Sequence, residues 1–323
     1  MKTTDFNEKY DYIDNKPRKK GGFGEIYDII DKKVKTEYIL KKIKKEKFFE
    51  SELKTLLEVK GTNIVNIVDW YYIQNEKCYY LVLEKMDGDL TMMLNEYKNG
   101  MPSKLIRKIF LQINSGLKIM KKNGKAHRDL NPKNILFSYT NDKKTDFIVK
   151  IGDFGLSKDL TSITKETSSK GGTPFYFAPE IFDGKYSNKC DLYSIGVLLY
   201  VFKTGDKNFI NFIDNIGDLR NNTIKNKKFD DEKLNNLIKN LVVSDPTNRM
   251  NWENYFEDPF FKDNDEDFQL SEESKIKIKI LDKRIIKENY ENKNCKIILI
   301  QLVIVIKELQ NKIIDLTNSK IIY

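Results

Sequence analysis

Three side chains in two short segments of the chain are well suited to chemistry: Asp129, Asn134 and Asp153. A carboxylate can accept a proton from an attacking hydroxyl group, and carboxylate and amide oxygens are the hard ligands that Mg²⁺ prefers. His127 is the only histidine, which argues against histidine-based zinc sites and Ser-His-Asp hydrolysis. These groups suit phosphoryl transfer, which needs positioning and charge more than covalent chemistry.

The two segments resemble motifs of eukaryotic protein kinases of the serine/threonine type. Residues 127–134, His-Arg-Asp-Leu-Asn-Pro-Lys-Asn, resemble the catalytic loop H-R-D-x-x-x-x-N, and residues 153–155 resemble the metal-binding D-F-G. The resemblance implies that Asp129 accepts or orients the substrate hydroxyl. It also implies that Asn134 and Asp153 hold magnesium against the phosphates of ATP.

One position of the catalytic loop departs from the serine/threonine pattern. Asn131 stands where these kinases usually carry a lysine beside the γ-phosphate. Lys133 stands where receptor tyrosine kinases carry an arginine. Our hypothesis is that Lys133 supplies the missing positive charge.

A glycine-rich run resembles the kinase loop that covers the phosphates, G-x-G-x-x-G-x-V. Glycine allows backbone N–H groups to approach phosphates without a Cβ in the way, although a tight hairpin would favour the same residues. Lys19 replaces the first glycine, and Arg18 stands where an apolar residue usually covers the adenine. The resemblance implies that the nucleotide is contacted by Gly21, Gly22, Phe23, Gly24 and Ile26.

Lys41 resembles the lysine of V-A-I-K, which pairs with the phosphates and with a glutamate on a helix. Glu52 is the predicted partner, and Glu50 is the alternative if the helix register slips. Ile39 and Lys41 share one strand face because side chains alternate with a period of two, so Lys42 points the other way.

Residues 83–86 are predicted to form the hinge that binds adenine through backbone groups. Ile39 stands where the family usually has alanine, which narrows the predicted adenine slot. Asp87 and Asp89 fit a contact with ribose or with a basic peptide. They equally fit a solvated turn. The residues predicted to line the slot are Ile39, Leu83, Glu84, Met86 and Leu136.

Residues 172–180 resemble the G-T-x-x-Y-x-A-P-E segment of serine/threonine kinases, which builds a peptide-docking ledge. The resemblance implies that Thr173 lies near Asp129 and helps to position the acceptor. It also implies a buried bidentate bridge between Glu180 and Arg249. Asp191 is expected to bind the backbone at residues 127–128.

The hydroxyl-rich segment 156–170 has the composition of an activation loop. Ser169 lies about where the family's activating phosphate falls, with Thr167 and Ser168 close by, and Arg128 offers a guanidinium for that phosphate. An unmodified loop is the open alternative.

Composition limits the class of protein. The chain has 323 residues, of which 40% are hydrophobic and 33% charged, with a formal net charge of +9. The lysines are spread along the chain and interleaved with acids, so we expect no nucleic-acid partner. Three widely spaced cysteines, a polar N-terminus and no apolar run long enough to cross a bilayer predict a cytoplasmic protein without a membrane span, with the nucleus left open.

The order of patterns predicts an α+β fold in which a β-rich lobe precedes a helical lobe, the bilobal order of protein kinases. The predicted kinase domain covers residues 10–262, and residues 263–323 form a predicted helical tail of unknown role. Apolar residues step by three and four between Leu299 and Leu316. That seam fits either a helix packed on its own chain or a short dimerising coiled coil.

Together these features predict an active serine/threonine protein kinase that uses ATP and Mg²⁺ and phosphorylates protein substrates. A pseudokinase, meaning a nucleotide-binding scaffold module, is the alternative, motivated by Arg18, Lys19 and Asn131. A small-molecule kinase on the same fold is disfavoured by residues 172–180.

Overall fold

The structure is a computed structural model, and it describes residues 6–21, 24–44, 46–159, 174–182, 187, 189–206, 224 and 227–262. The chain divides into two units, residues 1–262 and residues 263–323. The second unit lies entirely outside the described residues. The helical tail and its possible dimer contact therefore stay predictions.

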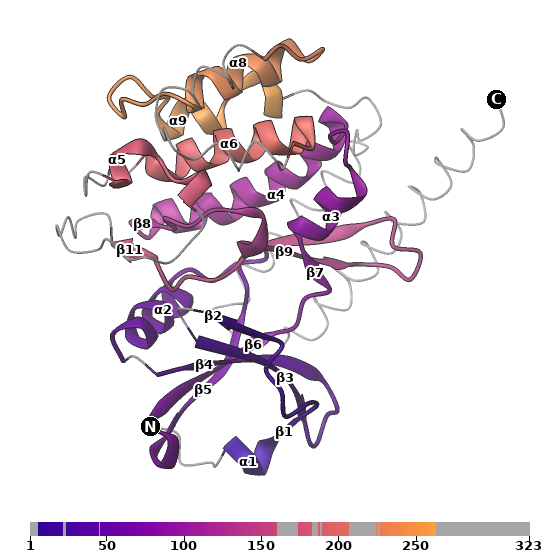
Figure 1. The fold of residues 1–323 in the computed structure, drawn as a ribbon, viewed down its shortest axis with the longest axis vertical. Helices are drawn as coiled ribbons and strands as arrows, with labels where there is room; N and C mark the ends of the chain where they lie inside the picture. Colours follow the sequence, from indigo (N-terminus) through magenta and orange to yellow (C-terminus); the bar gives the residue numbers. More distant parts are fainter. Residues whose placement is uncertain are drawn as a thin grey trace, which may run out of the picture. The chain divides into compact units, whose positions relative to one another are not determined.

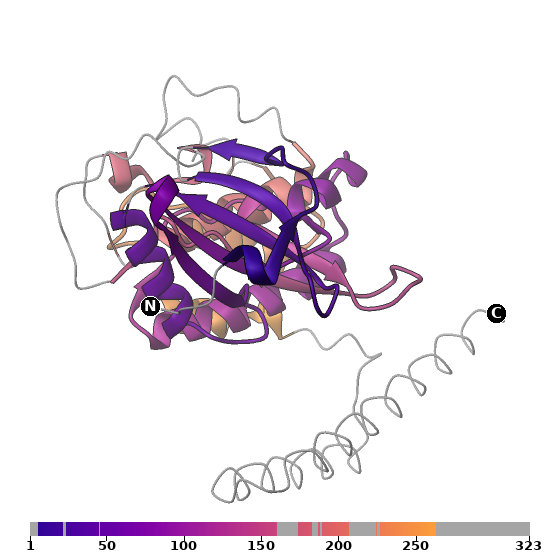
Figure 2. The ribbon, with the colours of Figure 1, turned by 90° about the horizontal axis from the view of Figure 1, so that it is seen from below.

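A twisted antiparallel sheet of six strands forms the beginning of the first unit (Figures 1 and 2). The strands are β1 (Tyr10–Tyr12), β2 (Lys19–Gly21), β3 (Gly24–Asp31), β4 (Glu37–Ile43), β5 (Ile67–Ile73) and β6 (Cys78–Glu84). Their order is β1-β3-β4-β6-β5, and β2 pairs with the first residues of β3. β-Branched and aromatic residues fill these strands, as a half-buried pleated surface favours.

An aromatic cluster covers one face of the sheet. The short helix α1 (Phe6–Lys9) places the Phe6 ring 5.6 Å from the Tyr71 ring and 4.8 Å from the Tyr80 ring, both edge-on. The buried Asp69 carboxylate accepts a hydrogen bond from Tyr71 Oη at 2.8 Å and pairs with Lys9 Nζ at 3.2 Å. The N-terminal segment thus stiffens the sheet that carries Lys41.

Helix α2 (Glu46–Glu58) packs against the other face of the sheet. Leu56 of this helix and Leu81 of β6 belong to the large core that continues into the helical part of the unit. The sequence placed Glu52, the predicted partner of Lys41, on a helix, and α2 contains Glu52.

The second part of the unit is helical (Figure 1). Its helices are α3 (Leu90–Glu96), α4 (Ser103–Lys122), α5 (Pro179–Phe182), α6 (Cys190–Thr204), α8 (Glu232–Leu241) and α9 (Trp252–Phe256). Helix α6 is buried on nearly all sides, and most of its residues are apolar, as a buried helix requires. A Cβ at Gly196 would lie 2.8 Å from Leu241 Cβ, so glycine permits the close packing of α6 against α8.

Short strands and turns lie between these parts and carry the predicted catalytic segments. They are β7 (Gly88–Asp89), β8 (Lys125–Ala126), the 3₁₀ turn η2 (Pro132–Asn134), β9 (Ile135–Tyr139), β10 (Phe147–Ile151) and β11 (Lys158–Asp159). Three other 3₁₀ turns lie elsewhere: η1 (Gln74–Glu76) between β5 and β6, η3 (Pro174–Tyr176) before α5, and η5 (Pro259–Phe261) after α9. Ile135 pairs with Ile151, and Gly152 N–H donates to the Asn134 carbonyl at 2.9 Å. This pairing brings Asn134 and Asp153 to the same end of one hairpin.

The predicted α+β, bilobal architecture is confirmed, because a sheet with helices α1 and α2 precedes a helical part. No helix among the described residues is both long and apolar enough to cross a bilayer.

Candidate active site

The loop between β8 and β9 holds Asp129 in a network of amide hydrogen bonds. Asn134 Nδ2 donates to Asp129 Oδ2 at 2.8 Å and to the Asp129 carbonyl at 2.8 Å. Asn131 Nδ2 donates to Asp129 Oδ1 and to the same carbonyl, both at 3.0 Å. All three residues are buried. The predicted base therefore has one defined orientation.

Buried groups behind the loop fix its backbone. The Asp191 carboxylate accepts hydrogen bonds from His127 N–H at 2.7 Å and Arg128 N–H at 2.8 Å, as the sequence predicted. His127 Nε2 lies 2.9 Å from the Gly152 carbonyl, which can only accept, so Nε2 carries the proton. Nδ1 then accepts from Asp129 N–H at 3.3 Å. His127 is fully buried beside Phe154, and these contacts make it a structural residue.

Lys41, Glu52 and Asp153 form a three-member ionic network beneath the sheet. Lys41 Nζ donates to both carboxylate oxygens of Glu52 at 2.7 Å and to Asp153 Oδ1 at 2.8 Å. The Glu52 side chain is 1% exposed, whereas the Asp153 side chain is 35% exposed. The alternative partner, Glu50, is an exposed residue. The network joins β4, α2 and the D-F-G segment, so α2 sits where a nucleotide-binding lysine needs it.

The charges of this network depend on one another. Burial disfavours the ammonium form of Lys41, but the carboxylates of Asp153 and Glu52 outweigh burial and raise the pKa of Lys41 above its ordinary value. Burial also works against ionisation of Asp153, yet Lys41 holds the pKa of Asp153 below its ordinary value. Burial raises the pKa of Glu52, with Lys41 opposing that rise. The exposed member, Asp153, is therefore held as the anion that a metal ligand must be.

The oxygen donors left over in the site suit magnesium. The amide nitrogen of Asn134 is used by Asp129, which leaves Asn134 Oδ1 as an acceptor, and Lys41 uses only Oδ1 of Asp153. Within the described residues no group of three His, Cys, Asp or Glu side chains could hold a metal by itself. One carboxylate and one amide fit a cation that keeps water and takes its remaining ligands from phosphates, as Mg²⁺ does.

The glycine-rich loop forms a hairpin between β2 and β3, where Gly21 pairs with Gly24. Gly24 has φ +144°, and a Cβ there would lie 2.2 Å from the Lys42 carbonyl, so this position requires glycine. Gly22 and Phe23 lie outside the described residues. Arg18, placed by the sequence over the adenine, pairs instead with Asp28 of β3 at 2.6 Å.

Most of the residues predicted to line the adenine slot lie on strands of the sheet and on β9. Ile39 of β4 pairs with Leu83 of β6, and Ile26 of β3 pairs with Lys41. The remaining predicted lining residue, Leu136, lies on β9 and is partly exposed, as Ile26, Ile39 and Leu83 are. Apolar side chains that are only partly covered fit a slot that an aromatic base fills.

The side chains at and after the predicted hinge make different contacts. Met86 is buried, and the Glu84 carboxylate pairs with Lys150 Nζ at 2.7 and 2.8 Å. The side chain of Glu84 is thus committed to β10, so only its backbone can meet a base. Asp89 caps α3 by accepting from Thr91 N–H at 2.9 Å, and Asp87 accepts from Tyr139 N–H at 2.8 Å.

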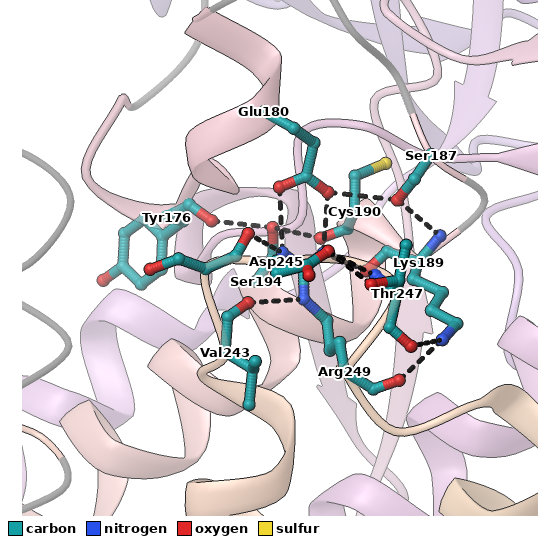
Figure 3. A network of polar contacts seen from close by, with 11 residues as sticks. Tyr176, Glu180, Ser187, Lys189, Cys190, Ser194, Val243, Asp245, Thr247 and Arg249 are labelled. Atoms are coloured by element: carbon teal, nitrogen blue, oxygen red, sulfur yellow. Dashed lines mark hydrogen bonds and ion pairs between the residues drawn. The ribbon is translucent and has the colours of Figure 1, made fainter.

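The segment that follows the predicted activation loop is anchored by one guanidinium (Figure 3). Arg249 donates to both oxygens of Glu180, at 2.7 and 2.8 Å, and the Arg249 side chain has no exposed surface. Thr173 and the candidate phosphorylation sites Thr167, Ser168 and Ser169 lie outside the described residues. The predicted bridge is present, and the position of Thr173 stays a prediction.

Residues 19–261 match the family described as "Protein kinase domain". The chain belongs to the protein kinase family. The matched segment contains the Lys41–Glu52–Asp153 network, the Asp129 loop and the Glu180–Arg249 bridge. Residues 6–12, which form α1 and β1, precede the matched segment and pack on the same sheet.

Curated relatives of this kinase domain are longer proteins. Calcium-dependent protein kinase 3 of Plasmodium berghei (strain Anka) is 28% identical over 98% of this chain and 57% of its own length. The DNA damage response protein kinase DUN1 of Saccharomyces cerevisiae is 33% identical over 78% of this chain and 53% of its own length. Serine/threonine-protein kinase atg1 of Dictyostelium discoideum is 30% identical over 80% of this chain and 40% of its own length. The chain thus spans about half the length of these relatives.

Sequence reasoning missed several contacts around the kinase site. The Glu84–Lys150 pair joins β6 to β10 across 66 residues, and Lys125 Nζ, almost fully buried, pairs with Glu58 of α2 at 2.7 Å. The period of two along a strand predicts that Lys150 and Ile148 project from the same face of β10. No local pattern marks the partner of either lysine, because both pairs depend on how distant elements pack.

Proposed function

We propose that this chain is an active serine/threonine protein kinase that transfers the γ-phosphate of Mg-ATP to serine or threonine hydroxyls of proteins. The observation that carries the proposal is the network in which Lys41 contacts both Glu52 and Asp153. Phosphoryl transfer needs the lysine, the helix glutamate and the metal ligand in place together. The relatives include serine/threonine-protein kinases, which supports the same activity.

Each residue of the site has a role in the proposed reaction. Lys41 binds the nucleotide phosphates, and Glu52 keeps its ammonium group in reach. Asp129 orients the acceptor hydroxyl and receives its proton. Asn134 and Asp153 would hold Mg²⁺, which when bound supplies positive charge to the phosphate oxygens. The apolar slot formed by Ile26, Ile39, Leu83 and Leu136 would enclose the adenine.

The alternative function is that of a pseudokinase acting as a nucleotide-binding scaffold. One observation favours this alternative. The lysine that serine/threonine kinases usually carry in the catalytic loop, beside the γ-phosphate, is replaced here by Asn131. The second departure, Arg18, has its charge balanced by Asp28 of β3 at 2.6 Å.

Transfer of labelled γ-phosphate to a generic basic protein is the test of the proposed function. We expect labelled phosphoserine or phosphothreonine with Mg-ATP. The label should disappear when the metal is chelated and return when Mg²⁺ is restored, because the site itself offers only two metal ligands. Absence of transfer even after phosphorylation of residues 167–169, with ATP still bound, would favour the pseudokinase.

Lys133 is proposed to supply charge to the γ-phosphate. Lys133 is exposed on the catalytic loop, and its ammonium group forms no ion pair with any of the described residues. Lys133→Ala should lower kcat by about tenfold on every substrate, less than the loss of a fully enclosed donor. Single-turnover transfer, with Asp129→Asn as the inactive reference, measures this. Unchanged turnover in Lys133→Ala beside an inactive Asp129→Asn contradicts the role.

Protein substrates with serine or threonine acceptors are the proposed partners, and ATP is the proposed cosubstrate. The cytoplasmic location remains a prediction.

A further inference from the structure

The Asp129 carboxylate is held on both of its oxygens by neutral amides. Asn134 donates to Oδ2 at 2.8 Å and Asn131 donates to Oδ1 at 3.0 Å. Asn131 is 2% exposed and Asn134 is 6% exposed, so water competes little for either contact. Both amides also donate to the Asp129 carbonyl, at 2.8 and 3.0 Å. Asp129 is therefore held through both its side-chain carboxylate and its backbone carbonyl.

The direction of the Asn131 amide is set by its partners. Lys133 N–H is a donor and lies 2.9 Å from Asn131 Oδ1, so this end of the amide must be the oxygen. The other end faces a carbonyl and a carboxylate, which accept only, so it must be the nitrogen. Asn131 has extended backbone angles and caps η2 with the same oxygen. A short turn thus aims the amide nitrogen at Asp129.

We propose that Asn131 is a positioning residue that holds the Asp129 carboxylate in the orientation that receives the acceptor proton. This inference rests on the proposed function. A lysine at this position would add charge, whereas the amide orients the carboxylate without neutralising it. Asn131 acts through Asp129 and has no predicted contact with nucleotide. Its loss should therefore lower kcat while the KM for ATP stays within about twofold.

Asn131→Asp is the sharpest test of this role. The new oxygen still accepts Lys133 N–H, but a second carboxylate replaces the donor facing Asp129. We expect kcat to fall by about 10²-fold, the scale of a small misplacement of a reacting group. The urea midpoint should also fall, because two carboxylates would share one buried site.

Asn141→Asp is the matched control. Asn141 lies in the exposed turn between β9 and β10, where its Oδ1 accepts Thr145 N–H at 3.0 Å and its Nδ2 donates to Thr145 Oγ1 at 2.9 Å. The same chemical change there should leave kcat within about twofold of wild type. If Asn131→Asp fails to fold, Asn131→Ser keeps an acceptor for Lys133 N–H, lacks the donor reaching Asp129, and should lower kcat by about tenfold.

The double variant Asp129→Asn with Asn131→Asp separates the contact from the chemistry. It restores an amide-to-carboxylate hydrogen bond with the two partners exchanged, so the urea midpoint should return toward wild type while transfer stays absent. An active wild type with an unaffected kcat in Asn131→Asp overturns the inference alone, as does a double variant no more stable than Asn131→Asp. A wild type that transfers no phosphate overturns the proposed function, and the positioning role with it.

Discussion

Replacing Lys41 with methionine should lower kcat/KM for phosphate transfer by about 10²- to 10³-fold, the usual loss when one preorganised donor is removed from a catalytic site. Lys41 Nζ links Glu52 on α2 to Asp153 in the D-F-G segment, with contacts of 2.7 and 2.8 Å. Methionine matches the length of the side chain but offers no charge or donor. The loss should appear in both kcat and the KM for ATP.

Lys42→Met is the matched control for Lys41→Met. Lys42 is the next residue of β4, faces the opposite side of the sheet, and pairs with Glu76. The chemical change is identical and the strand is the same, so a general effect on β4 would lower activity in both variants. We expect Lys42→Met to retain activity within about twofold of wild type. Equal losses in the two variants would contradict the role of Lys41.

The stability of Lys41→Met should depend on pH in a defined direction. Burial raises the pKa of Glu52 above its ordinary value of 4.5 even while Lys41 opposes that rise, and without Lys41 the rise is larger. A carboxyl group with a raised folded-state pKa binds its proton more tightly in the folded protein, so folding loses stability as pH rises through that pKa. The deficit in the free energy of unfolding relative to wild type should therefore shrink as the pH falls.

Urea unfolding of both proteins at about pH 8 and at about pH 6 measures this deficit. Asp153 should act in the same direction, because its low pKa depends on Lys41. A deficit that is the same at both pH values would mean that Glu52 is not the buried, uncompensated group.

The features of this site that could be predicted from the sequence are those whose residues lie close together along the chain. Asp129 and Asn134 were predictable because they lie five positions apart in one loop. Asp153 was predictable because it follows the strand that pairs with the strand after Asn134. Lys41 and Glu52 come from separate elements, yet the spacing of strand and helix still indicated the pair. The α+β order followed from the change from period two to helical spacing.

The contacts that sequence could not predict depend on packing between distant elements or on side-chain direction. The Glu84–Lys150 pair and the burial of Asp69 under α1 join residues about 60 or more positions apart, and no motif specifies them. Asn131 was recognised as a departure, but its type alone does not show that its amide nitrogen meets Asp129. That contact follows from the turn at η2, whose backbone angles the sequence does not reveal.

Replacing Arg249 with alanine should destabilise the helical part of the kinase domain by about 3–5 kcal/mol, because it leaves a buried carboxylate without its cation. Beyond the two bonds to Glu180, the guanidinium donates to the carbonyls of Lys189, Val243 and Ser244, at 2.9, 3.0 and 3.3 Å (Figure 3). These bonds join the segment after the predicted activation loop to α6 and to the end of α8. Unfolding by urea, followed by circular dichroism, measures the loss.

Two further variants distinguish the effect of losing the buried Glu180–Arg249 bridge from the effect of losing any positive charge. Arg249→Lys keeps the charge but cannot bond both Glu180 oxygens and the carbonyls, so it should recover only part of the lost stability. Lys262→Ala removes one partner of the exposed Lys262–Glu257 pair, whose side chains are 59% and 71% exposed, and should leave the urea midpoint nearly unchanged. If Arg249→Ala were no more damaging than Lys262→Ala, the bridge would not hold this region together. A large loss would instead mean that the segment around Glu180 depends on a single buried guanidinium that lies 69 positions further along the chain.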